Sequence, residues 1–364
     1  MHHEDPYYFA FSQMFGIGPT LFLRIENEFE SIESAYNAPQ SKMESIIGKS
    51  VAQKWQNFKS NFNPIAELSS LSKKGIHFIS KVSLLYPKAL REIIDPPIGL
   101  YLRGDPEIFT KYQHFFAIVG TRIPSSYGMQ ITADFASGLC HYGFIIVSGM
   151  AMGVDSVAHK AVVKAGKPTV AVLGCGIDTP FSYSKQKMYD EIIATGGAVI
   201  SEFPPAMNTK KGLFVARNRI ISGICRGTLV IEGTAHSGTL ITARYAALQG
   251  RDVFAPPVPI TSTLSQAPLL LLKQGAHLAT CVEDIISEYA VPMANIEEKR
   301  NNFADLGEHE QKVIQALLEE QLTPDKLAKR ISSPLIAVLG ALTTLEIAGI
   351  ITKQNDETYS VSIH

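Results

Sequence analysis

The sequence predicts an α/β protein whose core is a parallel β-sheet covered by helices on both faces. From Gln113 onwards, short apolar runs such as HFFAIVGTR, GFIIVSGMAMG and PTVAVLGCG end in glycine-rich turns. Helical patterns such as GVDSVAHKAVVKAG and GTLITARYAALQG lie between these runs. Apolar strands that alternate with helices are typical of a parallel sheet buried on both faces. Ligands of such sheets bind outside the carboxyl ends of the strands, where the glycine-rich turns lie.

The segment before the sheet, residues 1–85, contains short helical patterns and is expected to form a small domain of the helix-hairpin-helix or SAM-like kind. Its turn Gly16-Ile17-Gly18-Pro19 has the glycines that let backbone amides approach a phosphate. A plain turn between two helices explains the same residues, and we favour that interpretation. The sheet domain is expected over residues 86–290 and a polar linker over residues 291–306.

The last segment, residues 307–364, has the order of elements of a small winged-helix domain. Thr323 is the expected N-cap of one helix, the next helix is expected to stop at Gly349, and a ribbon is expected to turn at Asn355-Asp356. The helix over residues 334–348 contains no lysine or arginine. We therefore favour a protein-contact or packing role for this helix over the reading of duplex DNA.

Composition excludes several classes of protein. Hydrophobic residues make up 46% and charged residues 18%, which is typical of a globular chain and not of a disordered one. The 4 cysteines lie far apart without a CxxC pair, so we expect neither a zinc cage nor a disulfide framework, and we expect a cytoplasmic location. The opening MHHEDPYY is unlike a signal peptide, and four prolines interrupt the apolar stretch 254–272, so no membrane association is expected.

The familiar motifs of cofactor and nucleotide chemistry are missing from the sequence. The first turn of the sheet reads GTRIPSSYG instead of GxGxxG, and there is no GxxxxGK[ST], HExxH or GxSxG. Asp155 and His159 share a helix face, but a helix-capping aspartate bonded to a histidine explains them better than an acid–base pair. We expect no catalytic residue, no metal and no cofactor.

The remaining motifs predict a site for a phosphate-rich ligand. The net charge of the chain is -1, yet seven basic residues and two acidic residues lie between Pro205 and Asp252. Cations that follow phosphates, together with an aromatic ring on which a base stacks, are what single-stranded nucleic acid requires. The candidate residues are Arg122, Lys211, Phe214, Arg217 and Asn218.

Turn residues complete this candidate site. Backbone amides in turns at the ends of strands are expected to contact phosphates. The turn residues expected to do so are Gly120, Thr121, Ser148, Gly149, Ser237, Gly238 and Thr239. Arg219 is two positions along the helix from Arg217 and points about 200° away from it. We therefore expect Arg219 to cap a carbonyl or to pair with an acidic neighbour.

In order from about Ala117 to Asp284, the motifs VGTR, SGMAMGVDSVAH, SEFPP, FVARNRIISG and SGTLITA resemble the family of the DNA-processing protein DprA, also called Smf. The resemblance implies an extended Rossmann-like domain that binds single-stranded DNA and forms homodimers. It also implies protection of incoming DNA and help in loading the RecA recombinase during natural transformation and recombination. The family's DNA-contacting positions fall on the same Arg122, Lys211, Phe214, Arg217 and Asn218.

The chain departs from the family pattern after GRDVFA, where it reads PPVPITSTLSQAPLLLL instead of continuing with VPG and a glycine-containing loop. The resemblance places the dimer contacts near Leu269, Leu272 and Leu278, although an internal helix would have the same apolar residues. The alternative function is a nucleotide phosphoribohydrolase-like enzyme of the same Rossmann subgroup. Such enzymes carry a catalytic glutamate in PGGxGTxxE, and no glutamate follows Gly238-Thr239 here.

Overall fold

The computed structural model describes residues 3–207, 211–289, 306–348, 350–353 and 357–361. The chain divides into two compact units, residues 1–285 and residues 286–364. Within the described ranges no single helix has the length and apolar character needed to cross a membrane. Two helices of the second unit, Pro324–Arg330 and Leu335–Ile347, meet that test only together, as a pair bent by 115°.

The first unit begins with helices packed around an aromatic core. These helices are α1 (Asp5–Gln13), α2 (Pro19–Glu28), α3 (Ile32–Asn37), α4 (Gln40–Ile47), α5 (Lys49–Lys59) and α6 (Pro64–Lys73). The indole of Trp55 stacks on Phe11, with 4.2 Å between the ring centroids. The hydroxyl of Tyr101 in the sheet bonds to Ser12 at 2.6 Å and to Gln13 at 2.8 Å, which attaches α1 to the sheet.

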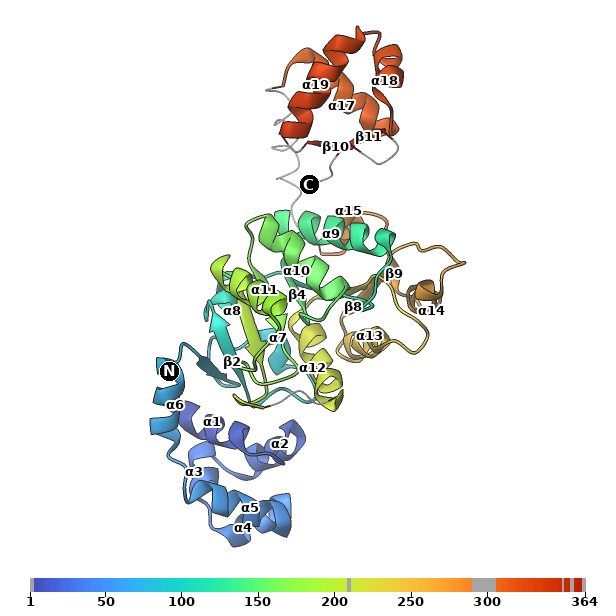
Figure 1. The fold of residues 1–364 in the computed structure, drawn as a ribbon. Coiled ribbons are helices and arrows are strands. Elements are labelled where there is room, and N and C mark those ends of the chain that lie inside the picture. The colour runs from blue at the N-terminus through green and yellow to red at the C-terminus, as the bar shows by residue number, and fades with distance from the viewer. Residues whose placement is uncertain (1–2, 208–210, 290–305, 349, 354–356, 362–364) are drawn as a thin grey trace. The chain divides into compact units, whose positions relative to one another are not determined.

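The sheet has nine strands in the order β1-β2-β6-β5-β4-β3-β7-β8-β9 (Figure 1). The strands are β1 (His77–Ser80), β2 (Gly99–Gly104), β3 (Phe115–Val119), β4 (Ile145–Ser148), β5 (Thr169–Val172), β6 (Ala198–Ser201), β7 (Gly227–Val230), β8 (Asp252–Ala255) and β9 (His277–Leu278). From β6 to β9 all neighbouring strands are parallel, whereas β2 is antiparallel to both β1 and β6. The sheet thus starts at His77, earlier than the domain boundary expected from the sequence.

The strand order is that of a Rossmann sheet. Strands β5-β4-β3-β7-β8-β9 follow the doubly wound order, and β6, β2 and β1 extend the sheet at one edge. The chain runs from β3 outwards to β6 and then returns to β7 on the other side of β3. The topological switch point therefore lies between β3 and β7, and the prediction of an extended Rossmann-like sheet is confirmed.

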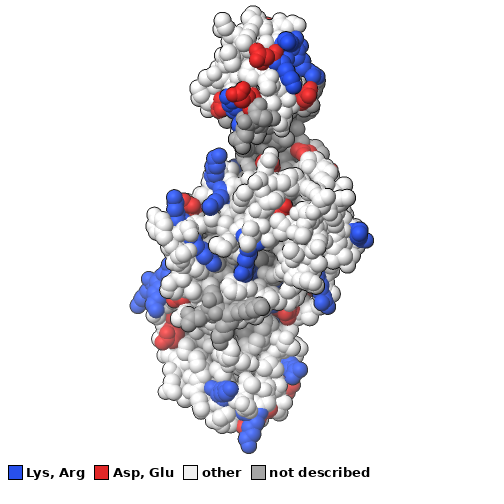
Figure 2. Space-filling view, turned by 45° about the vertical axis from the view of Figure 1, so that its right-hand side comes forward, with Lys and Arg blue, Asp and Glu red and all other residues white. Residues whose placement is uncertain are grey.

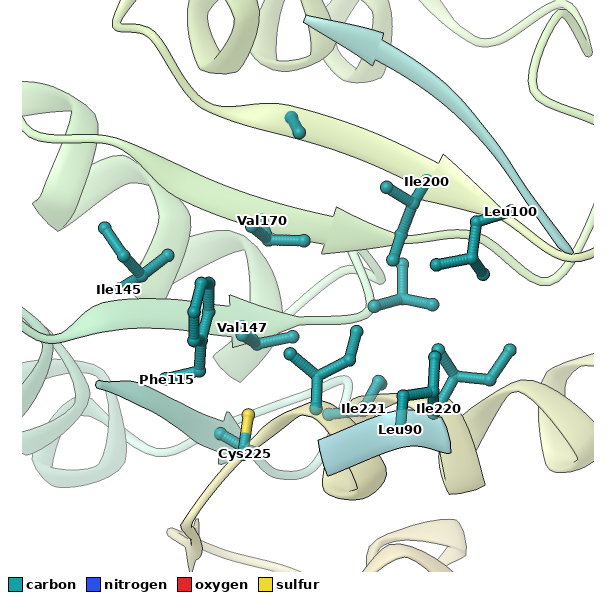
Figure 3. Packing of buried hydrophobic residues seen from close by; sticks show 14 of the residues in the cluster. Leu90, Leu100, Phe115, Ile145, Val147, Val170, Ile200, Ile220, Ile221 and Cys225 are labelled. Atoms are coloured by element: carbon teal, nitrogen blue, oxygen red, sulfur yellow. The ribbon is translucent and has the colours of Figure 1, made fainter. Parts of the chain in front are cut away.

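Helices cover both faces of the sheet, as the continuous apolar strands predict. One face contacts α7 (Lys88–Arg91), α12 (Lys211–Ile224), α13 (Gly238–Leu248) and α14 (Gln266–Lys273), and the other contacts α9 (Ser126–His141), α10 (Val154–Lys164) and α11 (Tyr183–Ala194). Figure 3 shows Ile220 and Ile221 of α12 packed with Leu90 against Val147 and Ile200 of the strands. Burial of this α12 face fixes where its other face points. The other described helical segments of this unit are α8 (Ile108–Lys111), the 3-10 helix η1 (Thr263–Ser265) and α15 (Val282–Glu288). Helix α15 continues three residues beyond Ile285, where the first unit ends.

From residue 306 onwards, the described part of the second unit has three helices followed by an antiparallel ribbon, which is the predicted order. These elements are α17 (Glu308–Glu319), α18 (Pro324–Arg330), α19 (Leu335–Ile347), β10 (Ile351–Lys353) and β11 (Tyr359–Val361). Thr323 occupies the N-cap position of α18, as expected, although its side chain makes no capping bond. The expected helix stop at Gly349, the turn at Asn355-Asp356 and nearly all of the linker 291–306 lie outside the described residues. The winged-helix assignment therefore stays a prediction.

Candidate nucleic-acid interface

A cavity of about 830 Å³ lies at the carboxyl ends of β3 and β7, at the topological switch point. Four segments supply its walls: the turn after β3, the turn after β4 with the start of α10, helix α12, and the start of α13 with the two residues before it. Four of the five candidate DNA-contacting residues line it, together with most of the candidate turns. The lining residues that bear on the argument are Gly120, Thr121, Arg122, Asp155, Phe214, Arg217, Asn218, His236, Ser237, Gly238, Thr239 and Thr242. We call this space the rim cavity.

The turn that carries Arg122 is held rigidly by its neighbours. The Thr121 amide donates to the carbonyl oxygen of Glu232 at 2.8 Å, and the Val154 amide donates to the carbonyl oxygen of Thr121 at 3.1 Å. A Cβ on Gly120 would lie 2.4 Å from Val154, so only glycine fits at this close approach. The exposed Arg122 guanidinium carbon lies 5.7 Å from the centre of the Phe214 ring. Arg122 and Phe214 thus present a cation and an aromatic ring side by side.

Glu232 fastens the other end of this turn. Its carboxylate accepts hydrogen bonds from the Ser125 amide at 2.9 Å and from the Ser125 hydroxyl at 2.6 Å. Ser125 in turn caps α9 by accepting from the Gly128 amide at 3.0 Å. The Glu232 side chain is buried and fully engaged in positioning the Arg122 turn.

On α12, Phe214, Arg217 and Asn218 share one face because they lie three and four positions apart. Phe214 is half-buried, since the glycine turn after β5 packs on it: a Cβ on Gly174 would lie 2.8 Å from the ring. Lys211 begins α12, but its side chain lies outside the described residues. The structure therefore brings Phe214, Arg217 and Asn218 together with Arg122 and leaves the Lys211 side chain unplaced.

Arg217 is more deeply placed than the sequence suggests. It is only 4% exposed, and its Nη1 donates to the carbonyl oxygen of Gly149 at 2.8 Å and to that of Val172. Its Nε donates to the Asn218 side chain at 3.2 Å. Burial lowers the pKa of Arg217, and the neighbouring Asp155 carboxylate opposes this shift. Arg217 thus holds the ends of β4 and β5 together, a structural role that we did not predict; a phosphate contact by this residue stays a prediction.

The predicted hydrogen bond between Asp155 and His159 is wrong. Asp155 accepts from the Ala151 amide at 3.3 Å, whereas Nδ1 of His159 lies 2.9 Å from the Thr169 hydroxyl. That hydroxyl donates to the carbonyl oxygen of Ile146, so His159 is the donor to Thr169. Burial lowers the pKa of His159 to about 3 and raises the pKa of Asp155. His159 joins α10 to β5 as a neutral side chain.

The candidate turn residues fall into two groups, those that line the rim cavity and those that do not. Gly120, Thr121, Ser237, Gly238 and Thr239 line the rim cavity, with Ser237 at the N-cap of α13. The turn residues Ser148 and Gly149 do not line it. Ser148 is fully buried and its hydroxyl donates to Ile118, and the Gly149 carbonyl is the acceptor for Arg217. These two residues therefore contact the strand ends and Arg217, and not the space of the rim cavity.

Two cavity-lining residues, His236 and Thr242, were missed by the sequence reasoning. His236 directly precedes the predicted turn at Ser237, and Thr242 is one helical turn beyond Gly238. Helical spacing from a predicted contact would have found Thr242. The structure adds Lys185 of α11 as a neighbouring cation, with its Nζ 4.4 Å from the centre of the Phe181 ring. Burial lowers the pKa of Lys185, and the nearby Arg217 and Arg122 contribute to this shift.

Arg219 pairs with acidic neighbours, as predicted. Its Nη2 donates to the carboxylate of Glu202, and its Nε lies 3.1 Å from the carboxylate of Asp95. The Arg219 side chain is 4% exposed and that of Glu202 is 9% exposed, so this pair is buried. Arg219 therefore tethers α12 to the end of β6 and does not reach the rim cavity.

On the face of the molecule that Figure 2 shows, the positive charge is spread over several places. Uncharged residues lie between these groups of lysine and arginine side chains. Among the described residues no cluster of three or more His, Cys, Asp or Glu side chains is arranged to hold a metal ion.

The candidate dimer residues lie near the edge strand β9. Leu269 and Leu272 of α14 are half-buried, and Leu278 of β9 is 52% exposed. The loop that departs from the family pattern is tied to its surroundings: the Tyr127 hydroxyl donates to Pro257 at 2.7 Å, and the Ser265 hydroxyl donates to Pro259 at 2.6 Å.

Comparison with known proteins identifies the family. The model of the family described as DNA recombination-mediator protein A matches residues 77–290, which span the sheet from β1 onwards. The chain belongs to this family. Its match begins at the first strand that the structure assigns to the sheet.

Curated relatives agree with this assignment. The chain is 35% identical to protein Smf of Escherichia coli over 78% of its own length and 77% of the relative. It is 38% identical to the DNA processing protein DprA of Streptococcus pneumoniae over 56% of its own length and 71% of the relative.

Two solved structures resemble the fold. The X-ray structure of DprA from Streptococcus pneumoniae superposes with a TM-score of 0.68 at 30% identity, covering 79% of this chain and 99% of that one. A DprA structure from Helicobacter pylori, whose subject is its single-stranded DNA binding mode, gives a TM-score of 0.51 at 30% identity, covering 56% of this chain and 92% of that one. The chain is thus similar to DNA processing proteins in both sequence and fold.

Proposed function

We propose that this protein binds single-stranded DNA in the rim cavity, protects incoming DNA and helps to load the RecA recombinase in natural transformation and recombination. The observation that carries the proposal is the pairing of Arg122 with Phe214 in the lining of this cavity, with 5.7 Å between the guanidinium carbon and the ring centre. An exposed guanidinium attracts a phosphate, and an aromatic ring stacks on a base of any sequence. The single-stranded DNA named for the Helicobacter pylori relative supports the same ligand.

The chemistry of the cavity favours binding without turnover. Its acidic lining residue Asp155 lies beside Arg217 and bonds to the Ala151 amide. The buried Glu232 is engaged with Ser125. We therefore propose a DNA-binding protein that uses no cofactor and no metal. The wide spacing of its cysteines, without a CxxC pair, favours a cytoplasmic location.

The assembly we propose is a homodimer that uses Leu269, Leu272 and Leu278. Leu278 is exposed and belongs to β9, the last strand of the sheet order. Apolar residues at an exposed sheet edge favour association with a second chain. A dimer has two rim cavities, and if both bind one DNA strand the avidity for long strands increases.

The test compares Arg122→Ala and Phe214→Ala with Lys164→Ala, an exposed lysine on α10 that lies outside the cavity lining. Loss of one phosphate contact should lower the slope of log K against log salt by about 0.7. Loss of stacking should weaken binding about tenfold and leave the slope unchanged. Lys164→Ala should match the parent. Arg122→Ala with parental affinity and slope would contradict the proposed site.

A further inference from the structure

A second cavity, of about 520 Å³, lies between α13 and α14, over the first residues of β8 and β9. The two helices cover the same face of the sheet (Figure 1). Leucine, alanine and valine side chains supply most of the cavity walls, and its charged or ionisable groups are Arg244, Arg251, Asp252 and His277. We call this space the α13 groove.

Helix α13 separates the α13 groove from the rim cavity. The α13 residues that line the rim cavity are Gly238, Thr239, Ile241 and Thr242, and those that line the groove are Leu240, Ala243, Arg244 and Ala247. At about 100° per residue, the two sets point in nearly opposite directions. A ligand therefore passes from one space to the other by crossing a single helix, which with its side chains is about 10–12 Å across.

The outer face of α13, which forms the surface between the two spaces, carries no negative charge. The helix reads GTLITARYAAL, so Arg244 is its one charged residue. Next to Arg244 on this face lie the half-buried Ile241 and Tyr245 and the exposed Leu248. A polyanion that crosses α13 thus meets a cation and no carboxylate of this helix.

Arg244 is a free cation at the groove. Its side chain is exposed, and within the described ranges it makes no hydrogen bond or ion pair with the protein. Arg251 adds a second positive charge, although its Nη2 is engaged with the carbonyl oxygen of Ala89 at 3.0 Å. From residue 240 to residue 277 the chain has three lysine or arginine residues and one acidic residue, Asp252. The charge of the groove therefore favours an anionic ligand.

The walls of the groove indicate which part of a nucleic acid fits. Among the described residues that line it there is no phenylalanine, tyrosine or tryptophan on which a base could stack. The sugar–phosphate backbone combines an apolar sugar ring for the leucine and alanine walls with a phosphate for Arg244. A guanidinium presents two parallel N–H groups to the oxygens of such a phosphate.

We propose that the α13 groove binds the sugar–phosphate backbone of the same single strand whose bases occupy the rim cavity. The strand crosses the outer face of α13, and Arg244 contacts one of its phosphates. Even at the stacked spacing of about 3.4 Å per nucleotide, a strand of about 12 nucleotides reaches about 40 Å, which is more than the crossing requires. This inference rests on the proposed function, because it assigns a second contact to the same ligand.

The first test uses Arg244→Ala, since loss of an exposed side chain should leave the fold intact. The control is Lys164→Ala, an exposed cation outside both spaces. For an oligothymidylate of about 12 nucleotides, Arg244→Ala should lower the slope of log K against log salt by about 0.7 and weaken binding about fivefold at 0.1 M salt. Arg244→Lys keeps the charge and should restore the slope. Binding of a trinucleotide, which fills only the rim cavity, should be parental in all variants.

The outcomes of this test separate the groove from the rim cavity. Equal slopes of Arg244→Ala and Lys164→Ala for the long strand would overturn the proposal and leave the rim cavity in place. Weaker binding of the trinucleotide by Arg244→Ala would also overturn it, because the residue would then act on the rim cavity. Failure of the parent to bind either oligomer would contradict the proposed function itself.

The second test asks whether DNA or a second copy of the chain occupies the groove. Sedimentation velocity of Arg244→Ala should show the parental assembly, and a smaller assembly would assign the groove to the second copy and overturn the proposal. Oligothymidylates with uncharged methylphosphonate linkages in either the 5′ or the 3′ half then locate the contact. For one half, the loss of affinity should be about fivefold smaller in Arg244→Ala than in Lys164→Ala. Equal losses in the two variants for both halves would contradict a phosphate contact by Arg244.

Discussion

At the scale of single residues, His159 makes the stability of the first unit depend on pH. Its pKa is about 3 in the folded chain because the ring is fully buried, against about 6.5 in an unfolded chain. Below pH 6.5 the unfolded state therefore takes up a proton that the folded state does not bind. The stabilisation is complete above pH 6.5 and is lost as the pH falls towards 3.

This difference predicts that the free energy of unfolding falls by about 2 kcal/mol at pH 5 through His159 alone. His159→Asn keeps a donor near the Thr169 hydroxyl and removes the titrating group. Denaturant unfolding at pH 7.5 and pH 5 should show a loss about 2 kcal/mol smaller in the variant than in the parent. The buried Asp155, whose pKa is raised, titrates in both chains and cancels in this comparison. An identical pH dependence of the two chains would contradict the assignment.

Which residues lie together at the site could be predicted from the sequence. The contacts that each of these residues makes could be predicted less well. Motif order and helical spacing were enough to bring Phe214, Arg217 and Asn218 to one face near Arg122. The carbonyl contacts of Arg217 were not predictable, because they depend on the ends of two strands that are 45 and 68 residues away in sequence. The partner of His159 was missed for the same reason, since Thr169 belongs to the neighbouring strand.

At the scale of elements, α12 is the part of the fold on which the site depends. One face of this helix packs through Ile220 and Ile221 on the sheet, and Arg219 ties it to Glu202 and Asp95. Its remaining face supplies Phe214 to the rim cavity. A helix held on two sides presents its ligand-binding residues in a fixed geometry.

This arrangement predicts that Arg219→Ala destabilises the first unit without removing its site. Loss of Arg219 leaves Glu202 buried without its cation, which costs about 3–5 kcal/mol. Arg244→Ala, on the exposed surface of α13, should change the free energy of unfolding by less than about 0.5 kcal/mol. Denaturant unfolding measures both variants. Parental stability of Arg219→Ala would show that the buried pair does not hold α12.

Element types were predictable because apolar strands and helices alternate so regularly from residue 113 to the end of the sheet. The strands β1 and β2 were not predicted as part of this sheet. They join it antiparallel at its edge, and His77–Ser80 lies in a segment that reads as the end of a helical domain. Such long-range edge pairing has no local signature in the sequence.

At the scale of the whole molecule, the proposed function requires a site that accepts a flexible strand. The rim cavity is a recess at the end of a sheet and not a protruding basic helix. In the second unit, α19 (Leu335–Ile347) carries no lysine or arginine to enter a major groove. If Phe214 stacks on a base as we propose, it requires an unpaired base, so a blunt duplex should be excluded from the cavity.

The most direct test of this account is a titration of the full-length chain with a single-stranded oligonucleotide and with a blunt duplex of the same length and sequence, at one salt concentration. Fluorescence anisotropy of the labelled strand measures both affinities, and Phe214→Ala serves as the matched variant. We predict that the parent binds the single strand at least about tenfold more tightly than the duplex, and that Phe214→Ala loses most of this preference. Equal affinity of the parent for the two DNA forms would contradict the account.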